Sequence, residues 1–520
     1  MGKKGYGRDG VFRSLKPPLV LPGDTDLSLA QFLFDRTSSS SSKPAITEAD
    51  SSLTLSFSEL RSIVINVAHG LHRMGICRND VVLLLSHNCY LYLVCFLAVT
   101  YIGAIATTAN PVNTAKELSK QVKDCNPKMV ITVPELWNKV RDMKLPTVFL
   151  EGHRSSDRPV SEVKQSDVAC ILYSSGTTGL SKGVVLTHRN FIATSLAFTI
   201  EQATSGEVDR VYSCFLPMFH VFGLSIINYC QLVCGNSIVT MKKFEMESFL
   251  CAVEMYKVTD VCAVPPVILA LVKQKSEIKH DLSSLRKIIS GAAPLGKELM
   301  DECALAFPQA TVLQGYGMTE TCGIISVDFS VSNRRRTGSV GGLVAGVEAK
   351  IVSIDSLKPL GPNEKGEIWV RGPNVMRGYL NNAQATEQAI DGEGWLRTGD
   401  LGYFDDDGCL YIADRIKELI KYKGYQVAPA ELEGILLSNA GILDAAVIPY
   451  PNEEAGEVPA AYVVRRDDCL LTEDVVKAFV NDQVAPYKRL RHVFFIKVVP
   501  KSASGKILRK ELIRKVRSKI

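Results

Sequence analysis

A short loop of small and hydroxyl-bearing residues, from Tyr173 to Val184, constrains this chain more than any other stretch. Its sequence is Tyr-Ser-Ser-Gly-Thr-Thr-Gly-Leu-Ser-Lys-Gly-Val, and it follows the apolar run 168–172, which is typical of a buried strand. The glycines let backbone N–H groups approach an anion, the hydroxyls add hydrogen-bond donors, and Lys182 adds a compact positive charge. The loop therefore predicts a phosphate-binding site at the end of a strand.

This loop differs from a P-loop, in which Gly-Lys-Ser/Thr opens a helix directly. Here Lys182 is followed by Gly-Val-Val-Leu, which has the character of a strand, and Thr187 is the expected N-cap of the helix that comes next. The sequence thus indicates a nucleotide loop of another kind. The alternative, a polar surface turn, accounts poorly for the density and order of Ser, Thr and Gly.

Length and charge limit the class of protein. A chain of 520 residues is longer than one hydrophobic core usually supports, so we expect at least two domains. With 46% hydrophobic and 22% charged residues, the composition is that of an ordinary globular protein. A net charge of only +5, without a basic patch interleaved with aromatic residues, makes nucleic acid an unexpected partner.

The spacing of the cysteines and the length of the apolar runs limit the class of protein further. The 14 cysteines show no Cys-x-x-Cys spacing and read as small buried residues in a reducing compartment, which argues against a zinc site or a disulfide framework. The N-terminus lacks the apolar region of a signal peptide, and Tyr6 argues against N-myristoylation. The uncharged stretch 90–106 is expected to be a buried helix; a membrane span is the alternative.

The order of predicted elements indicates an α/β fold. Apolar strands alternate with helical patterns over some 300 residues, which favours doubly wound parallel sheets in a large N-terminal domain. After about residue 335, short strands between Gly and Pro turns suggest a small antiparallel or barrel-like unit. The last segment has its own strands and helices, enough for a small α+β domain. We therefore predict two domains, residues 1–416 and 417–520.

Four further motifs carry chemical groups. A histidine lies among aromatic residues in 217–223, and small residues follow predicted strands in 290–295 and 314–320, where ligands of α/β sheets bind. In the third motif Thr319 can contact a phosphate and Glu320 can hold Mg²⁺. In the fourth motif a Thr-Gly-Asp turn ends in a carboxylate suited to the hydroxyls of a ribose. Taken singly, a packed core histidine and an ordinary turn are the alternatives.

The collinear order of these motifs resembles the acyl-adenylate-forming (AMP-binding) superfamily. The resemblance runs from about residue 50 to Ser504-Gly505-Lys506 and is strongest to the plant 4-coumarate:CoA ligases and ligase-like proteins. Their motif Lys-Glu-Leu-Ile-Lys-Tyr-Lys-Gly-x-Gln-Val-Ala-Pro-Ala-Glu-Leu-Glu is found at 417–433, with Tyr425 at the open position. The resemblance implies a mobile C-terminal domain with its hinge near Lys417.

It also implies a two-step reaction that uses ATP, Mg²⁺ and CoA: a carboxylic acid and ATP give acyl-AMP and pyrophosphate, and CoA then displaces AMP to give a thioester. The residues implied as catalytic are Lys506, His220, Lys421 and Lys417. Those implied to bind ATP or AMP are Ser174, Ser175, Gly176, Thr177, Thr178, Lys182, Gln314, Gly315, Thr319, Asp400, Arg415 and Lys506. The implied acyl pocket comprises His220, Phe222, Ile226, Ala292, Gly315, Gly317, Ile324, Ile325 and Val327. The implied CoA ligands are Lys243, Lys423 and Gly424, and the implied metal ligand is Glu320.

The sequence departs from the family pattern mainly in the acyl pocket. Ser181 replaces a usual proline in the first loop, which changes loop stiffness. Branched and aromatic apolar residues at 222, 226, 324, 325 and 327 put hydroxycinnamates in doubt and suit a less polar acid: an unsubstituted cinnamate-type acid, a fatty acid or an oxylipin. Two other functions stay open, namely a luciferase-like enzyme that oxidises its acyl-adenylate and a non-catalytic protein that binds acyl-AMP or a nucleotide.

The final tripeptide bears on location. Ser518-Lys519-Ile520 differs from the peroxisomal address Ser-Lys-Leu only by an isomeric last side chain. We therefore expect a peroxisomal enzyme, with the peroxisomal import receptor as a partner. A cytoplasmic enzyme whose basic C-terminal helix simply ends in this way is the alternative.

Overall fold

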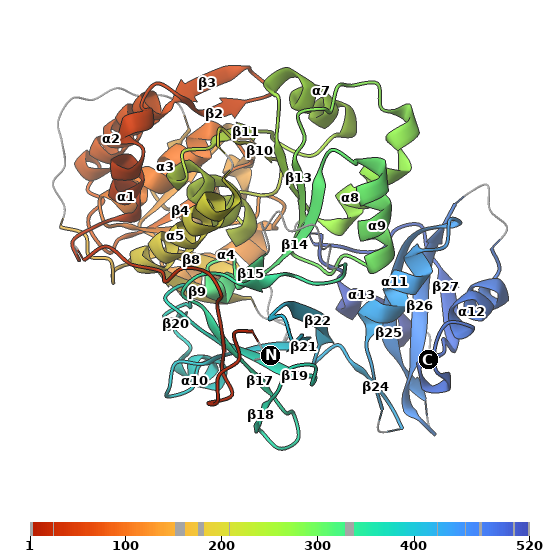
Figure 1. Ribbon diagram of the computed structural model, residues 1–520. Helices are drawn as coiled ribbons and strands as arrows, with labels where there is room; N and C mark the ends of the chain where they lie inside the picture. The colour runs from red at the N-terminus through yellow and green to blue at the C-terminus, as the bar shows by residue number, and fades with distance from the viewer. Residues whose placement is uncertain are drawn as a thin grey trace.

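The computed structural model describes residues 4–23, 25–150, 162–174, 181–206, 208–327, 337–423, 425–452, 454–466, 471–502 and 505–517. Two large sheets with helices packed around them make up most of the chain, and a blue C-terminal group of elements lies to one side (Figure 1). The strand pairings within the large sheets are mostly parallel. The predicted α/β fold with doubly wound sheets is confirmed.

The first large sheet has seven strands in the order β20-β9-β8-β5-β4-β6-β7. Their bounds are β4 Val81–Leu85, β5 Ile105–Thr108, β6 Met129–Thr132, β7 Thr147–Phe149, β8 Val168–Ser174, β9 Lys182–Thr187 and β20 Gly378–Tyr379. Strand β9 runs antiparallel to β8, so the chain turns back on itself at the predicted phosphate loop. Thr187 then caps the next helix through the N–H of Asn190, as the sequence predicts.

The second large sheet has nine strands in the order β16-β15-β14-β13-β12-β10-β11-β2-β3. Their bounds are β2 Pro44–Glu48, β3 Leu53–Ser56, β10 Val211–Cys214, β11 Ser237–Thr240, β12 Asp260–Ala263, β13 Lys287–Ser290, β14 Thr311–Tyr316, β15 Ser326–Val327 and β16 Gly342–Leu343. The helices of this part are α1 Leu29–Arg36, α2 Phe57–Arg73, α3 Tyr90–Tyr101, α4 Ala115–Cys125, α5 His188–Ser205, α6 Cys230–Val233, α7 Met246–Tyr256, α8 Pro265–Lys273 and α9 Lys297–Ala306.

Helix α3 settles the nature of the uncharged stretch 90–106. It has 12 residues, most of them buried, and the chain then continues into β5. At 1.5 Å per residue such a helix is too short to cross a bilayer. None of the described helices has the length and apolar character needed to span a membrane.

The third sheet follows in the chain and is antiparallel. Its members are β1 Phe12–Arg13, β17 Glu348–Val352, β18 Pro359–Leu360, β19 Gly366–Arg371, β21 Leu396–Phe404 and β22 Leu410–Arg415, with α10 Ala383–Ala389 beside it. The long pairing of β21 with β22 sets Asp400 opposite Arg415. The smaller sheet thus brings a carboxylate and a guanidinium together.

The C-terminal segment has a fold of its own. Its strands are β23 Ile420–Tyr422, β24 Tyr425–Val427, β25 Ile442–Asn452, β26 Gly456–Arg465 and β27 His492–Phe495, and its helices are α11 Pro429–Leu437, α12 Glu473–Asn481 and α13 Arg509–Arg517. Its buried hydrophobic residues form clusters separate from the large core that ends at Leu410. The predicted boundary at Lys417 falls between these cores; that the two parts move relative to each other stays a prediction.

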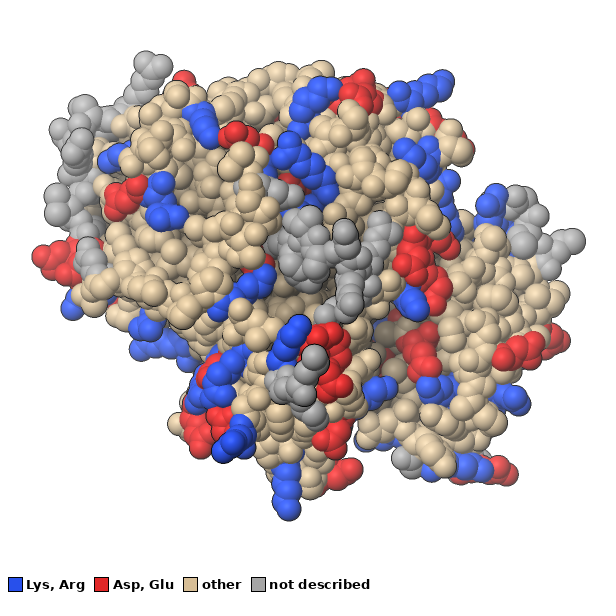
Figure 2. Space-filling model, viewed as in Figure 1, with Lys and Arg blue, Asp and Glu red and all other residues tan. Residues whose placement is uncertain are grey.

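Charges are mixed on the surface. On the face drawn in Figure 2, the Lys and Arg side chains that the structure describes are interspersed with Asp and Glu, and no broad patch of one sign forms. A nucleic-acid binding surface would need such a patch.

Candidate active site

A cavity of about 1420 Å³ gathers residues from all three N-terminal sheets and from the C-terminal segment. The predicted site residues that line it are Ser174, Lys182, His220, Phe222, Ile226, Ala292, Gly315, Gly317, Thr319, Glu320, Ile324, Val327, Asp400, Arg415, Lys417 and Lys506. Ser175, Gly176, Thr177, Thr178 and Gly424 lie outside the described residues. Side chains predicted from widely separated motifs thus share one space.

At one part of the cavity wall, a carboxylate is held by two hydroxyls. Glu320 lies in the 3₁₀ turn Thr319–Thr321, and its Oε1 accepts hydrogen bonds from Ser174 Oγ (3.2 Å) and Tyr379 Oη (2.9 Å). The ammonium of Lys182 lies 4.6 Å from the centre of the Tyr379 ring. A carboxylate and a cation are therefore fixed beside each other at the end of strand β8.

A second carboxylate, Asp400, is buried at the end of the antiparallel sheet. Its Oδ2 accepts a hydrogen bond from Tyr316 Oη at 2.7 Å, and its Oδ1 lies 3.5 Å from Arg415 Nε. Burial raises the pKa of Asp400 above its usual range, whereas Arg415 and Tyr316 oppose this shift. Because each carboxylate oxygen has two lone pairs, Asp400 can still accept hydrogen bonds from ligand hydroxyls.

Lys506 enters the cavity from the C-terminal segment. Two hydrogen bonds join it to Ser502: Ser502 N donates to Lys506 O (2.8 Å), and Lys506 N donates to Ser502 Oγ (3.1 Å). The adjacent Gly505 has φ +78°, and a Cβ there would lie 3.0 Å from Val264 of the N-terminal part. Glycine therefore lets the backbone beside Lys506 lie close to Val264 of the large domain.

The charge of Lys506 depends on pH near neutrality. Burial, with the nearby Arg415 guanidinium, lowers the pKa of Lys506 to about 8, although Glu418 and Asp400 act in the opposite direction. As pH rises through 8, the free enzyme loses the ammonium charge.

If the chain forms acyl-AMP as the family resemblance implies, we expect kcat/KM for ATP in that step to fall as pH rises above about 8, because kcat/KM reports ionisations of the free enzyme. Lys506→Arg keeps its charge far above this pH, so its remaining activity should not fall there. The pH dependence of both enzymes can be measured between pH 6 and 10 as the rate at which pyrophosphate exchanges into ATP in the presence of the carboxylic acid substrate. A wild-type profile that stays flat to pH 10 would contradict the role of this charge.

Another part of the cavity wall carries His220 among apolar side chains. His220 Nδ1 accepts a hydrogen bond from Phe222 N (3.3 Å), and burial lowers the pKa of His220 to about 4, so the ring is neutral near pH 7 with its proton on Nε2. A Cβ on Gly291 would lie 2.9 Å from the Phe222 ring, and one on Gly323 would lie 2.8 Å from Ile226. Glycines thus allow the backbone to pack directly on these side chains.

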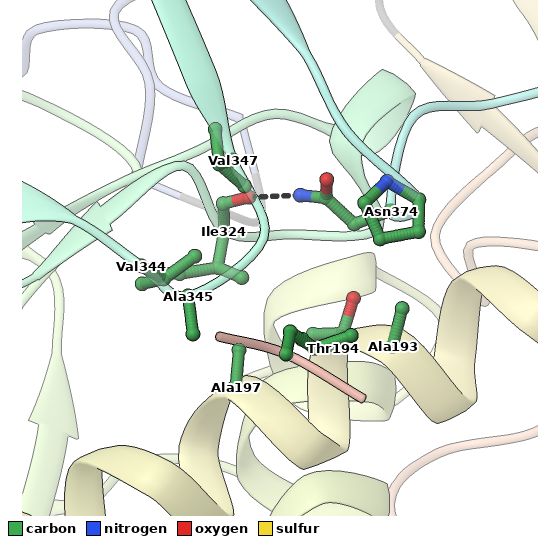
Figure 3. A pocket seen from close by; sticks show the side chains of 10 residues that line it. Ala193, Thr194, Ala197, Ile324, Val344, Ala345, Val347 and Asn374 are labelled. Carbon is green, nitrogen blue, oxygen red and sulfur yellow. Dashed lines mark hydrogen bonds between the residues drawn. The ribbon is translucent and has the colours of Figure 1, made fainter. Parts of the chain in front are cut away.

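Asn374 supports the loop that carries part of this wall. In Figure 3 its side chain points toward Ile324, and the carboxamide Nδ2 donates to the carbonyls of Ile324 (2.7 Å) and Thr321 (3.1 Å). Ala193, Thr194 and Ala197 of helix α5 lie below this contact in the same view. The loop after Glu320 is therefore fixed from behind by a buried amide.

Some predicted residues do not line the cavity. Gln314 is buried, and its Oε1 accepts a hydrogen bond from Leu295 N (3.0 Å), which fixes the neighbouring loop. Ile325 is fully buried behind Ile324. Lys421, which was predicted to be catalytic, also lies outside the lining, as do Lys243 and Lys423, which were predicted to bind CoA. Lys243 is exposed and pairs with Glu245 at 2.6 Å. Their roles stay predictions.

Two tyrosines were missed by sequence reasoning. Tyr316 donates to Asp400, and Tyr379 contacts both Glu320 and Lys182. Tyr316 lies inside a motif that was interpreted from its small residues, while Tyr379 lies in the sequence Arg-Gly-Tyr-Leu, which has no chemical signature. Pairing of β20 with β9, which the sequence does not reveal, brings Tyr379 to the site.

Comparison with known proteins gives a consistent result. The family model described as AMP-binding enzyme matches residues 33–380, and that described as AMP-binding enzyme C-terminal domain matches residues 431–506. Similar curated proteins include a probable CoA ligase of Humulus lupulus (43% identity over 100% of this chain and 98% of that protein) and the peroxisomal OPC-8:0-CoA ligase 1 of Arabidopsis thaliana (42%, 97% and 96%). Another is 4-coumarate:CoA ligase 2 of Nicotiana tabacum (42%, 98% and 97%).

Solved structures agree in fold. ATP-bound MatB from Rhodopseudomonas palustris has a TM-score of 0.86 at 28% identity, over 94% of this chain and 99% of that chain. The o-succinylbenzoate CoA synthetase of Bacillus subtilis, in complex with an acyl-adenylate intermediate, has a TM-score of 0.83 at 28% identity, over 95% and 98%.

Proposed function

The chain belongs to the AMP-binding enzyme family, and on that basis we propose which residues perform its two reactions and which acids it takes. It is an acid:CoA ligase that forms an acyl-AMP from ATP and then an acyl-CoA thioester. One observation supports this assignment of residues: a single cavity is lined by Lys506, by the Asp400–Arg415 pair, and by Glu320 and Lys182.

In the first step a carboxylate oxygen of the acid attacks the α-phosphorus of ATP, and pyrophosphate leaves. Two anions must approach, so cations and N–H donors have to offset their repulsion. We assign this work to Lys506, between the carboxylate and the α-phosphate, and to Lys182 with the loop 174–178 at the other phosphates. Asp400 and Arg415, which lie 3.5 Å apart, would bind the ribose: the Asp400 carboxylate would accept hydrogen bonds from its hydroxyls, and the Arg415 guanidinium would donate to them.

Glu320 is the residue we propose to hold Mg²⁺. Oxygen ligands suit this ion, which proteins usually bind through one or two carboxylates with substrate phosphates and water. A single carboxylate fits this pattern, since the described residues contain no group of three His, Cys, Asp or Glu side chains that could hold a metal. When bound with ATP, the ion would neutralise charge on the departing pyrophosphate.

The second step needs a different arrangement of the C-terminal segment. Lys506 lines the cavity, whereas Lys423 of the same segment does not. We propose that the segment turns about Lys417 after acyl-AMP has formed, so that Lys423 and Gly424, with Lys243, meet CoA and the thiol displaces AMP. Among the described residues, the polar contacts that such a turn would break include the one from Lys273 Nζ to Ile442 O at 3.0 Å.

A screen of carboxylic acids with ATP, Mg²⁺ and CoA tests this function. The wild-type enzyme should form pyrophosphate when acid and ATP are present, and should release AMP and form a thioester only when CoA is present as well. Turnover of the adenylate by oxygen without CoA, or nucleotide binding without any product, would contradict it.

We propose further that the acid is apolar, of an unsubstituted aromatic, fatty or oxylipin type. Phe222, Ile226, Ile324 and Val327 line the cavity and carry no polar group that could pair with a hydroxyl on the substrate. One similar protein, from Arabidopsis thaliana, is named for an acid other than coumarate.

We expect kcat/KM for cinnamate or a medium-chain acid to exceed that for 4-coumarate by roughly 5-fold to 150-fold, since an unpaired buried hydroxyl costs about 1–3 kcal/mol. Ile226→Ser should narrow this ratio by offering a partner for the hydroxyl. Ile227→Val, at a buried neighbour that does not line the cavity, is the matched control. Equal kcat/KM values for the three acids in the wild-type enzyme would show that the pocket does not select in this way.

We also propose a peroxisomal location. The support is the relative named as a peroxisomal ligase, together with the predicted address 518–520, which lies outside the described residues. A fluorescent protein fused to the N-terminus leaves this address free, and its signal should coincide with a peroxisomal marker. Removal of residues 518–520 should make the signal diffuse. Diffuse signal from the intact fusion would contradict the proposal.

A further inference from the structure

Tyr379 joins two groups that come from different parts of the chain. Its hydroxyl donates to Glu320 Oε1 at 2.9 Å, and its ring lies 4.6 Å from Lys182 Nζ. The side chain lines the cavity and is half-buried. One residue therefore contacts both the carboxylate and the cation at this end of the site.

The backbone of Tyr379 is fixed independently of these contacts. Strand β20 pairs with β9, with Tyr379 opposite Val184. The Tyr379 N–H donates to Thr386 Oγ1 at 2.9 Å. Because the main chain has its own partners, the side chain can be changed without removing the hydrogen bonds that hold the strand.

We propose that Tyr379 is a positioning residue for ATP with its metal ion: its hydroxyl orients Glu320, and its ring places the ammonium of Lys182. The inference rests on the proposed function, in which these two groups meet the phosphates. Glu320 Oε1 accepts hydrogen bonds from Tyr379 Oη and Ser174 Oγ, so the carboxylate is held in one orientation. The ring face attracts the lysine by a cation–π interaction.

The two parts of the side chain can be separated by substitution. Tyr379→Phe removes the hydroxyl and keeps the ring, so it should weaken binding of ATP in the presence of Mg²⁺ by about 10-fold, as expected for a hydrogen bond to a charged group. Binding of ATP in EDTA should change by less than about 2-fold. Tyr379→Leu also removes the ring and should weaken ATP binding in EDTA by roughly 3-fold to 30-fold.

Calorimetric titration of the full chain with ATP, in Mg²⁺ and in EDTA, measures these affinities without turnover. Tyr403→Leu is the matched control, because it removes a half-buried ring that stacks on Tyr411 and does not line the cavity. All variants should form thioester from supplied acyl-AMP at wild-type rates, since that step uses neither Mg²⁺ nor the outer phosphates.

Equal loss of affinity with and without Mg²⁺ in Tyr379→Phe, or parallel loss of thioester formation from acyl-AMP, would show a merely structural role and overturn the inference. Wild-type affinity of Tyr379→Phe for ATP with Mg²⁺ would overturn it as well. These outcomes leave the ligase function intact. Failure of the wild-type enzyme to form any acyl-AMP would instead contradict the function on which the inference rests.

Discussion

Lys506→Ala should slow acyl-AMP formation by roughly 10² to 10³, the effect of losing one preorganised charge contact to the reacting groups. In the structure its ammonium lies near Arg415 and Asp400, inside the cavity. Thioester formation from supplied acyl-AMP should be largely unaffected, because the charge is needed where the carboxylate meets ATP. Acid-dependent pyrophosphate exchange and transfer to CoA, assayed separately, measure the two steps.

A second lysine of the same segment provides the control. Lys497 is exposed and does not line the cavity, so Lys497→Ala removes one charge from this segment without touching the site. Both half-reactions should stay at wild-type rates in this variant. If Lys506→Ala slowed both steps equally, the lysine would not be specific to adenylation.

Lys417→Pro should slow the other half-reaction: transfer to CoA should fall, while acyl-AMP formation should stay measurable. Lys417 lies in the turn where Glu418 N and Leu419 N both donate to Arg415 O, between the two separate cores. Proline fixes φ and restricts the residue before it, so a rotation about this point would be obstructed at a cost of about 3 kcal/mol. Transfer to CoA should therefore fall on the order of 10² or more, while pyrophosphate exchange stays measurable.

Lys417→Ala separates the backbone effect from the loss of charge. It removes the side chain that lines the cavity but leaves φ free, so transfer to CoA should be slowed far less than in the proline variant. Full activity of Lys417→Pro in both steps would mean that the segment does not turn about this residue.

Local sequence patterns predicted the elements that depend on local chemistry. The strand ahead of the phosphate loop and the helix capped by Thr187 both have the predicted places, because a cap acts within one turn of chain. Strands alternating with helices likewise predicted the parallel sheets. Asp400 and Arg415 were named from the family resemblance, and strand pairing brings them together.

Other features depend on tertiary structure that no local pattern reveals. Tyr379 reaches Glu320 because a two-residue strand returns from beyond residue 370 to pair with β9. The pKa of Lys506 is lowered by burial between two parts of the chain, so neither part alone determines it. Gln314 Oε1 accepts a hydrogen bond from Leu295 N, a contact that no local pattern predicts, and the expected role of Gln314 at the adenylate stays a prediction. Such contacts require the assembled sheets.

The claim that the enzyme works through an acyl-adenylate is tested most directly by following the transfer of a carboxylate oxygen from the acid to AMP. An acid that the screen shows to be used is labelled with ¹⁸O in both carboxylate positions and supplied with ATP, Mg²⁺ and CoA. If a carboxylate oxygen attacks the α-phosphorus and CoA then displaces AMP, each thioester formed should be matched by one AMP that carries a single ¹⁸O, and the pyrophosphate should carry none. Label in inorganic phosphate with ADP as the nucleotide product, or unlabelled AMP alongside the thioester, would contradict an acyl-adenylate mechanism.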